Sequence, residues 1–282
     1  MIRRITILAT IAVLLCGCNR LKTEDDKKTI YVTIAPLKSI VEEIVCDDYN
    51  VEVLVPKGAS PETFEPTAKQ LISLNDAEFI YTTGLINFEQ SLTNSVQNNK
   101  RIIDLSHGIE LIEGSCSHGH HHHSHGVDPH IWTSFRSLKT MIRNIASTLN
   151  PDSTKYHTAA KELINRINYT DLHCCGKLSN SDVDAIMIYH PAFTYYARDY
   201  SIEQIAIEHD GKEPSPRQLT ALVNKAKQHN IKKILIQPQY NKDKLQALAA
   251  ECNAEIVEVD PLSEDIIAEI ERVTDIICGI NE

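Results

Sequence analysis

Two runs of alternating strand-like and helix-like segments constrain the fold of this chain most strongly. The first run begins at Thr29 and the second near residue 185. In both runs, short segments rich in β-branched residues alternate with segments whose apolar residues recur at helical spacing. This alternation is typical of parallel βαβ units with right-handed crossovers. Each run therefore predicts one α/β lobe built on a parallel sheet.

A long helical stretch separates the two runs. Pro151 would stand in its first turn, where proline is favoured, and apolar residues recur along one side of the stretch. We therefore predict an α/β fold of two Rossmann-like lobes with parallel sheets, at residues 29–150 and 179–282, joined by a long rigid helix at residues 151–178. Ligands of such sheets bind at the carboxyl ends of the strands, which directs the search for a site.

The N-terminus predicts export. Arg3 and Arg4 precede an apolar run at residues 5–15, which is too short for a bilayer span of about 20 residues, so residues 1–18 are predicted to be a secretory signal. The Leu-Cys-Gly-Cys sequence that ends at Cys18 resembles a bacterial lipobox, which would leave Cys18 as the acylated first residue. The alternative is a plain cleaved signal in which Cys18 is an ordinary thiol.

Charge and composition narrow the location and the partners. Residues 19–28 are charged, lack aromatic residues and predict an unfolded tether. The whole chain carries a formal net charge of −10, and removal of the two arginines of the signal gives −10 − 2 = −12. Such an acidic protein does not suit nucleic acid as a partner and favours a surface that collects cations. We expect a monomer in the periplasm or at the cell surface, anchored to a membrane by lipid at Cys18.

Four polar residues share a position relative to the predicted strands. Glu62, His130, His190 and Asp260 each follow a strand within a few residues of its carboxyl end, and two of them come from each lobe. Imidazole nitrogens and carboxylate oxygens are ligands that zinc accepts in tetrahedral geometry. Taken singly, a histidine or aspartate that precedes proline, as at His190 and Asp260, is also an ordinary turn or helix-start residue. Their shared placement predicts a metal site between the lobes.

A histidine-rich, low-complexity loop at residues 115–126 predicts a second, weaker kind of metal binding. Imidazoles have an ordinary pKa of about 6.5, so most are neutral outside the cell and free to coordinate. A flexible loop must be ordered at each capture, which weakens binding relative to a built site. The loop would therefore collect zinc for the cleft, although a solvated spacer that merely tolerates histidine is the alternative. Its histidines are His118, His120, His121, His122, His123 and His125.

Five segments resemble, in order, the metal-specific solute-binding proteins of zinc and manganese ABC importers, of the ZnuA-like type. The likeness covers nearly all of residues 29–282. The segments are Gly58-Ala-Ser-Pro-Glu-Thr-Phe-Glu-Pro-Thr67, Asp128-Pro-His-Ile-Trp132, Tyr189-His-Pro-Ala-Phe193, Gly211-Lys-Glu-Pro-Ser-Pro216 and Val259-Asp-Pro-Leu262.

This resemblance implies a non-catalytic receptor. Its metal would lie between two lobes joined by a long helix, with His130, His190 and Asp260 as ligands, and its partner would be an ABC transporter permease. The resemblance also implies a disulfide between Cys252 and Cys278. These two residues lie in the same predicted lobe, and in the chain-entropy model their bridge would contribute about 3–4 kcal/mol.

Glu62 departs from the family pattern, because members usually have histidine at this position. A site of two imidazoles and two carboxylates shifts the metal preference toward Mn2+ or Fe2+, although Zn2+ still binds such a set. The histidine-rich loop keeps Zn2+ as the expected metal. Glu65 lies one helical turn from Glu62 and could replace it as a ligand, but its expected role is to cap the following helix.

Three functions remain open on the sequence alone. The first is a receptor that captures Zn2+ and delivers it to an importer. The second is a metal-dependent hydrolase that uses His130, His190 and Asp260 as ligands, an open water position, and Glu62 as general base. The third is a surface adhesin or zinc buffer in which only the histidine-rich loop binds metal.

Overall fold

The computed structural model describes residues 27–97, 101–113, 126–150, 153–209 and 211–280. The predicted signal, nearly all of the predicted tether and all six histidines of the loop lie outside these residues. The first strand begins at Lys28, one residue inside the segment predicted to be a tether. Among the described residues, no helix combines the length and apolar character needed to cross a membrane.

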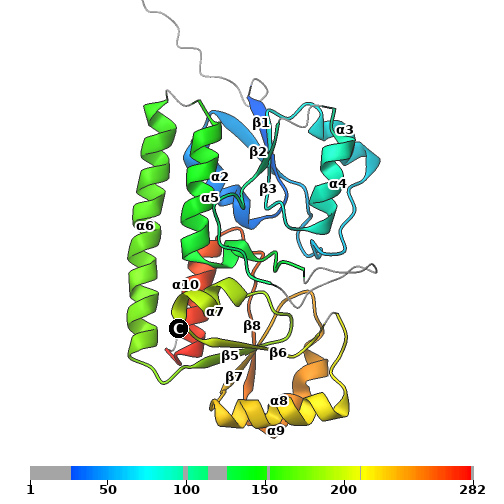
Figure 1. The fold of residues 1–282 in the computed structure, drawn as a ribbon, viewed down its shortest axis with the longest axis vertical. Coiled ribbons are helices and arrows are strands. Elements are labelled where there is room, and N and C mark those ends of the chain that lie inside the picture. Colours follow the sequence, from blue (N-terminus) through cyan, green and yellow to red (C-terminus); the bar gives the residue numbers. More distant parts are fainter. Residues whose placement is uncertain (1–26, 98–100, 114–125, 151–152, 210, 281–282) are drawn as a thin grey trace, which may run out of the picture.

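The N-terminal lobe is built on a parallel sheet with strand order β2-β1-β3-β4 (Figure 1). The chain folds this way because buried β-branched residues of the strands pack against helices whose apolar residues share one face. In α2, for example, Leu37, Ile40, Val41 and Ile44 are all buried. The elements are β1 Lys28–Val32, α2 Pro36–Val45, β2 Tyr49–Val53, α3 Ala68–Leu74, β3 Phe79–Thr82, α4 Asn87–Ser95, β4 Ile102–Asp104, η3 Ile131–Thr133 and α5 Phe135–Thr148.

The C-terminal lobe repeats the pattern with the strand order β6-β5-β7-β8, again fully parallel. Its central strand β5, Ala185–Ile188, is buried at every position, as expected for a strand covered on both faces. The other elements are α7 Thr194–Tyr200, β6 Glu203–Ala206, α8 Pro216–Gln228, β7 Lys233–Ile236, η4 Lys242–Leu245, α9 Gln246–Cys252, β8 Glu255–Glu258 and α10 Ile266–Ile277. The predicted class of two parallel-sheet α/β lobes is confirmed.

The long helix α6, Thr154–Ser179, runs beside both lobes (Figure 1). It packs against α2 and α5 of the N-terminal lobe and against α10 of the C-terminal lobe. One hydrophobic cluster continues through these helices from Ile30 in the first sheet to Ile186 in the second. Because the lobes share this core, α6 acts as a stiff frame that fixes how the carboxyl ends of the two sheets face each other.

The disulfide expected between Cys252 and Cys278 is not formed in this structure, where both thiols are free in the described part of the chain. Cys252 ends α9 and packs in the cluster that contains Met187, whereas Cys278 follows α10 and packs against the cluster that contains Ile186. Adjacent residues of a strand point to opposite faces of a sheet. The two cysteines therefore lie on opposite faces of the C-terminal sheet, which separates them.

Candidate metal centre

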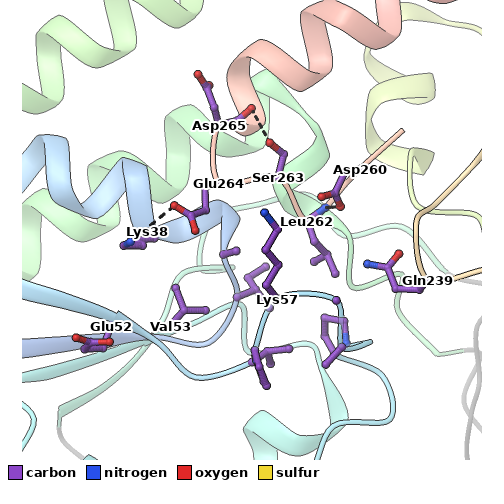
Figure 2. A pocket seen from close by; sticks show the side chains of 17 residues that line it. Lys38, Glu52, Val53, Lys57, Gln239, Asp260, Leu262, Ser263, Glu264 and Asp265 are labelled. Carbon is purple, nitrogen blue, oxygen red and sulfur yellow. Dashed lines mark hydrogen bonds and ion pairs between the residues drawn. The ribbon is translucent and has the colours of Figure 1, made fainter. Parts of the chain in front are cut away.

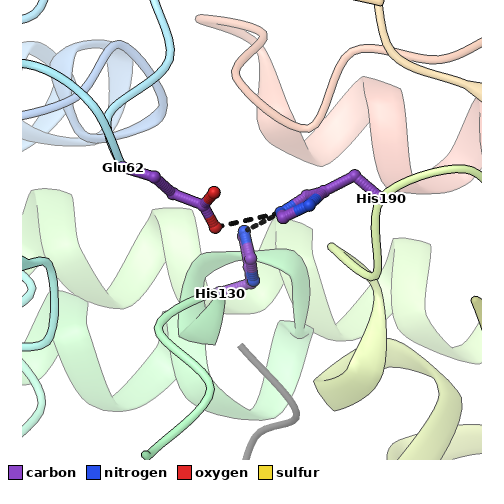
Figure 3. Close-up of side chains that lie close together, drawn as sticks. All are labelled: Glu62, His130 and His190. Carbon is purple, nitrogen blue, oxygen red and sulfur yellow. Dashed lines mark hydrogen bonds and ion pairs between the residues drawn. The ribbon is translucent and has the colours of Figure 1, made fainter. Parts of the chain in front are cut away.

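Glu62, His130 and His190 converge between the lobes (Figure 3). Each offers one ligand atom, and these atoms all lie within 4.8 Å of one another. Glu62 comes from the loop between β2 and α3, His130 directly precedes η3, and His190 follows β5. The two histidines are each 5% exposed, and the Glu62 side chain is 16% exposed.

The distances within this group suit a tetrahedral cation. The two histidine Nε2 atoms are 3.4 Å apart, and Nε2 of His190 is 3.1 Å from Oε1 of Glu62. Ligands held at about 2.0–2.1 Å from a tetrahedral zinc ion lie about 3.3–3.4 Å from each other. Both distances from Nε2 of His190 therefore stand near the spacing that zinc imposes, and a tetrahedral ion would keep a fourth coordination position for water or another donor.

Asp128 orients the ring of His130. Its Oδ1 accepts a hydrogen bond from Nδ1 of His130 at 2.9 Å and another from the His130 backbone N–H at 2.9 Å. A carboxylate can only accept, so Nδ1 carries the proton and the lone pair of Nε2 faces the site. Burial acts to raise the pKa of Asp128, but His130 outweighs it and holds that pKa below its ordinary value. Tyr195 of the C-terminal lobe donates to the Asp128 carbonyl at 2.8 Å.

Glu208 orients His190 in the same way. Its Oε1 lies 2.7 Å from Nδ1 of His190, and the Glu208 side chain is nearly fully buried. Gln237 fixes the backbone of His190 from both sides, since it accepts from the His190 N–H at 3.3 Å and donates to the His190 carbonyl at 2.7 Å. Both imidazoles are thus held before a metal arrives.

Removal of these orienting carboxylates gives a first prediction. Asp128→Asn and Glu208→Gln keep every ligand, yet each is expected to weaken zinc binding about 10- to 100-fold, because the rings lose both their fixed tautomer and their basicity. Competition with a chromogenic chelator measures the constants, and Glu203→Gln, an exposed acid on the same lobe, serves as control. Unchanged constants in both variants would show that the two carboxylates do not position the ligands.

The pKa of His190 is raised to about 9. Burial acts to lower it, but the hydrogen bonds and negative charges of Glu208 and Glu62 outweigh burial. In the metal-free protein at neutral pH, His190 therefore carries a proton on Nε2 that faces Glu62. A divalent cation must displace this proton, so metal and proton compete for the same atom.

This competition sets the pH dependence of binding. Below about pH 9 the zinc association constant is expected to rise about tenfold per pH unit, because each bound ion releases the His190 proton, and to level off above that pH. Calorimetry at pH 7.5 in two buffers of different ionisation enthalpy measures the protons released, which we expect to be close to one. Zero release would contradict the assignment of His190 as a ligand.

Asp260, predicted as the fourth ligand, does not belong to the group. It directly follows Val259 after β8, and β7 separates β8 from β5, which carries His190. Neighbouring strands are about 4.8 Å apart, so these two strand ends begin about 10 Å from each other. The half-buried Asp260 side chain instead accepts from the Leu262 N–H at 3.0 Å, and burial raises its pKa. The exposed Glu65 is not in the group either.

Two cavities adjoin the centre. The chamber around the three ligands has a volume of about 40 Å³ and is walled by Trp132, Tyr240 and Leu262 among others. A larger cleft of about 610 Å³ between the lobes contains Asp260 and Lys57 (Figure 2). A water molecule occupies about 30 Å³, whereas pockets for organic ligands measure about 300–1,000 Å³. The chamber thus has room for an ion with about one water.

The sequence prediction missed Asp128, Glu208 and Gln237. The signal that identified His190 could have found two of them, because Glu208 and Gln237 also follow the strands β6 and β7 almost directly. Together with His190 and Asp260 they form a row of polar residues along the carboxyl edge of the C-terminal sheet. Asp128 could have been noted from its position two residues before His130.

Comparisons with known proteins find relatives that align with most of this chain. The "High-affinity zinc uptake system protein ZnuA" of Bacillus subtilis is 28% identical over 272 residues, which cover 88% of this chain and 84% of that protein. The "Zinc-binding lipoprotein AdcA" of Streptococcus pneumoniae is 27% identical over 267 residues, covering 89% of this chain but 53% of AdcA. The chain therefore spans about half the length of the AdcA relatives.

Solved structures of zinc- and manganese-binding proteins also superpose on most of this chain. A crystal structure of ZnuA superposes with a TM-score of 0.81 at 30% identity and covers 91% of this chain and 100% of that chain. A zinc-bound deletion mutant of ZnuA gives 0.80 at 31% identity, with coverage of 91% and 99%. The Mn2+ complex of FpvC from Pseudomonas aeruginosa, at 21% identity and a TM-score of 0.76, shares the fold. A family model described as "Zinc-uptake complex component A periplasmic" matches residues 30–272. The chain belongs to this ZnuA family.

Proposed function

We propose that this protein is an extracytoplasmic receptor that captures Zn2+ at Glu62, His130 and His190 and delivers it to the permease of an ABC-type importer. One observation carries the proposal: two imidazole Nε2 atoms and a carboxylate converge in a small chamber, with His190 Nε2 at near-tetrahedral spacing from the other two ligands. Without a cation or a proton between them, these atoms would repel each other. The names of the ZnuA and AdcA relatives support zinc as the cargo.

The donor set favours zinc over the alternatives of Mn2+ and Fe2+. Two imidazoles and one carboxylate in a chamber of about 40 Å³ suit four-coordinate zinc. Mn2+ prefers about six ligands that are mostly oxygen atoms, for which the chamber has little room. Metal binding would tie Glu62 and His130 of one lobe to His190 of the other and shift the population toward a closed form that docks on the transporter. A lipid at Cys18 would keep the receptor at the membrane.

Thermal unfolding of the chain lacking residues 115–126 tests this function. At a free zinc concentration 100 times the dissociation constant, binding is expected to stabilise the protein by about 2.7 kcal/mol, which raises the melting temperature by about 5–10 °C. The deletion also separates the remaining hypotheses, because a receptor keeps one tight site whereas a buffer loses nearly all of its zinc. A melting temperature that is indifferent to zinc, manganese and chelator would rule the receptor out.

A further inference from the structure

The metal chamber and the large inter-lobe cleft are neighbours with a common wall. Three residues, Pro61, Gln239 and Leu262, line both cavities. His130 and His190 are almost fully buried, so an ion reaches or leaves them by passing the residues that wall the chamber. The shared wall lies between the ligands and a cleft of about 610 Å³.

The three wall residues differ in how easily they can move. Pro61 is buried and has a rigid ring. The backbone of Leu262 is held by its N–H, which donates to Asp260 at 3.0 Å. Gln239 is half-exposed and follows β7 by three residues, in a turn between that strand and η4. Its side chain is long and has several rotatable bonds, and its amide oxygen can briefly coordinate a passing ion.

The cleft beyond the wall has charges suited to a cation path. Its lining carries four acids and two lysines, giving a formal charge of 2 − 4 = −2. Lys57 extends from the N-terminal lobe toward the segment that bears Asp260 and Ser263 (Figure 2). The positive charge of Lys57 already interacts with the Asp260 carboxylate. It would therefore repel an incoming cation and offset the attraction of that carboxylate.

We propose that the zinc ion enters and leaves the centre through this cleft, with Gln239 as the movable gate and Lys57 as a charge that slows the passage of cations. The proposal rests on the proposed function, since it concerns the route to the same site. Neither residue is a ligand. Both are therefore expected to control rates of binding and release more strongly than the equilibrium constant.

The chain contains a natural reporter for these rates. Trp132 is its single tryptophan, and the Trp132 ring lies 5.2 Å from that of His130. Stopped-flow fluorescence of the full chain mixed with Zn2+ gives the association rate, and mixing the zinc complex with excess chelator gives the release rate.

The gate is tested by truncation. Gln239→Ala is expected to increase the release rate about tenfold while the dissociation constant changes less than about threefold, because no ligand is lost. Ile86→Val is the matched control, since Ile86 lines the chamber but not the cleft. A release rate within twofold of the wild type in Gln239→Ala, or an equal acceleration in Ile86→Val, overturns the gate.

The route is tested by charge. In water of 10 mM ionic strength, a divalent ion that passes a like unit charge at about 10 Å is repelled enough to slow association about threefold. Lys57→Gln is therefore expected to speed association about threefold at that ionic strength and hardly at all in high salt. Lys244→Gln is the control, because Lys244 is exposed beside Tyr189, whose ring contacts Tyr240 on another wall of the chamber. Acceleration by Lys244→Gln in place of Lys57→Gln overturns the route.

These outcomes separate the two proposals. A wild-type protein that binds no zinc removes the receptor function itself, whereas tight binding with unaltered rates in both Gln239→Ala and Lys57→Gln removes only the passage through the cleft.

Discussion

Replacement of His190 by alanine is expected to lower the zinc association constant of the chain lacking residues 115–126 by about 10²–10³-fold. The magnitude follows because a structural zinc site with about 10–16 kcal/mol of binding free energy divides it among four coordination positions, three of which are protein ligands here. The variant also leaves Glu208, which is 4% exposed, without the imidazole that it holds at 2.7 Å. Calorimetry in competition with a chelator measures the constant.

The control for this experiment is His157→Ala, which removes an exposed histidine from α6. It should leave zinc binding unchanged. Because loss of a buried histidine can also weaken the fold, the melting temperature of the metal-free His190→Ala protein must be measured alongside. A folded His190→Ala variant that binds zinc as tightly as the wild type would contradict the assignment.

The second prediction with a large effect distinguishes the contribution of Glu62 to zinc binding from that of Asp260. We expect Glu62→Ala to weaken zinc binding about 100-fold, as loss of one ligand does, and Asp260→Ala to change it less than about threefold. The reason is geometric, since Oε1 of Glu62 lies 3.1 Å from Nε2 of His190 while Asp260 stands outside the group of ligand atoms. Calorimetry on both variants at one pH makes the comparison.

Two further results complete this test. Glu62→His, which restores the residue expected from the family resemblance, should retain zinc binding and increase the preference for zinc over manganese, because it replaces a hard oxygen donor with nitrogen. The opposite order, with Asp260→Ala more damaging than Glu62→Ala, would mean that the metal recruits Asp260 and displaces Glu62 when it binds.

Much of the fold could be predicted from the sequence because local and global signals agree in this chain. Apolar periodicity changes between strand and helix spacing at nearly every element, and the long helix α6, Thr154–Ser179, lies close to the predicted residues 151–178. Three of the predicted residues, Glu62, His130 and His190, converge. His190 directly follows β5, as the rule for ligands of parallel sheets predicts, whereas Glu62 and His130 lie in loops well beyond the ends of β2 and β4.

The expectations that the structure does not reproduce depend on strand order and on the face of the sheet. Sequence places His190 and Asp260 after strands of one sheet but does not state that β7 lies between those strands. Likewise, it places Cys252 and Cys278 in one lobe without revealing that their helices cover opposite faces. The buried partners Asp128 and Glu208 were missed because a carboxylate that orients a ligand has no spacing signature of its own.

The most direct test of the central claim is a crystal structure of the zinc-loaded protein with anomalous scattering recorded at the zinc edge. The account predicts one strong peak in the chamber, about 2.0–2.2 Å from Nε2 of His130, Nε2 of His190 and a carboxylate oxygen of Glu62. A peak bound by other residues, or a chamber without zinc between the two imidazoles, would contradict it.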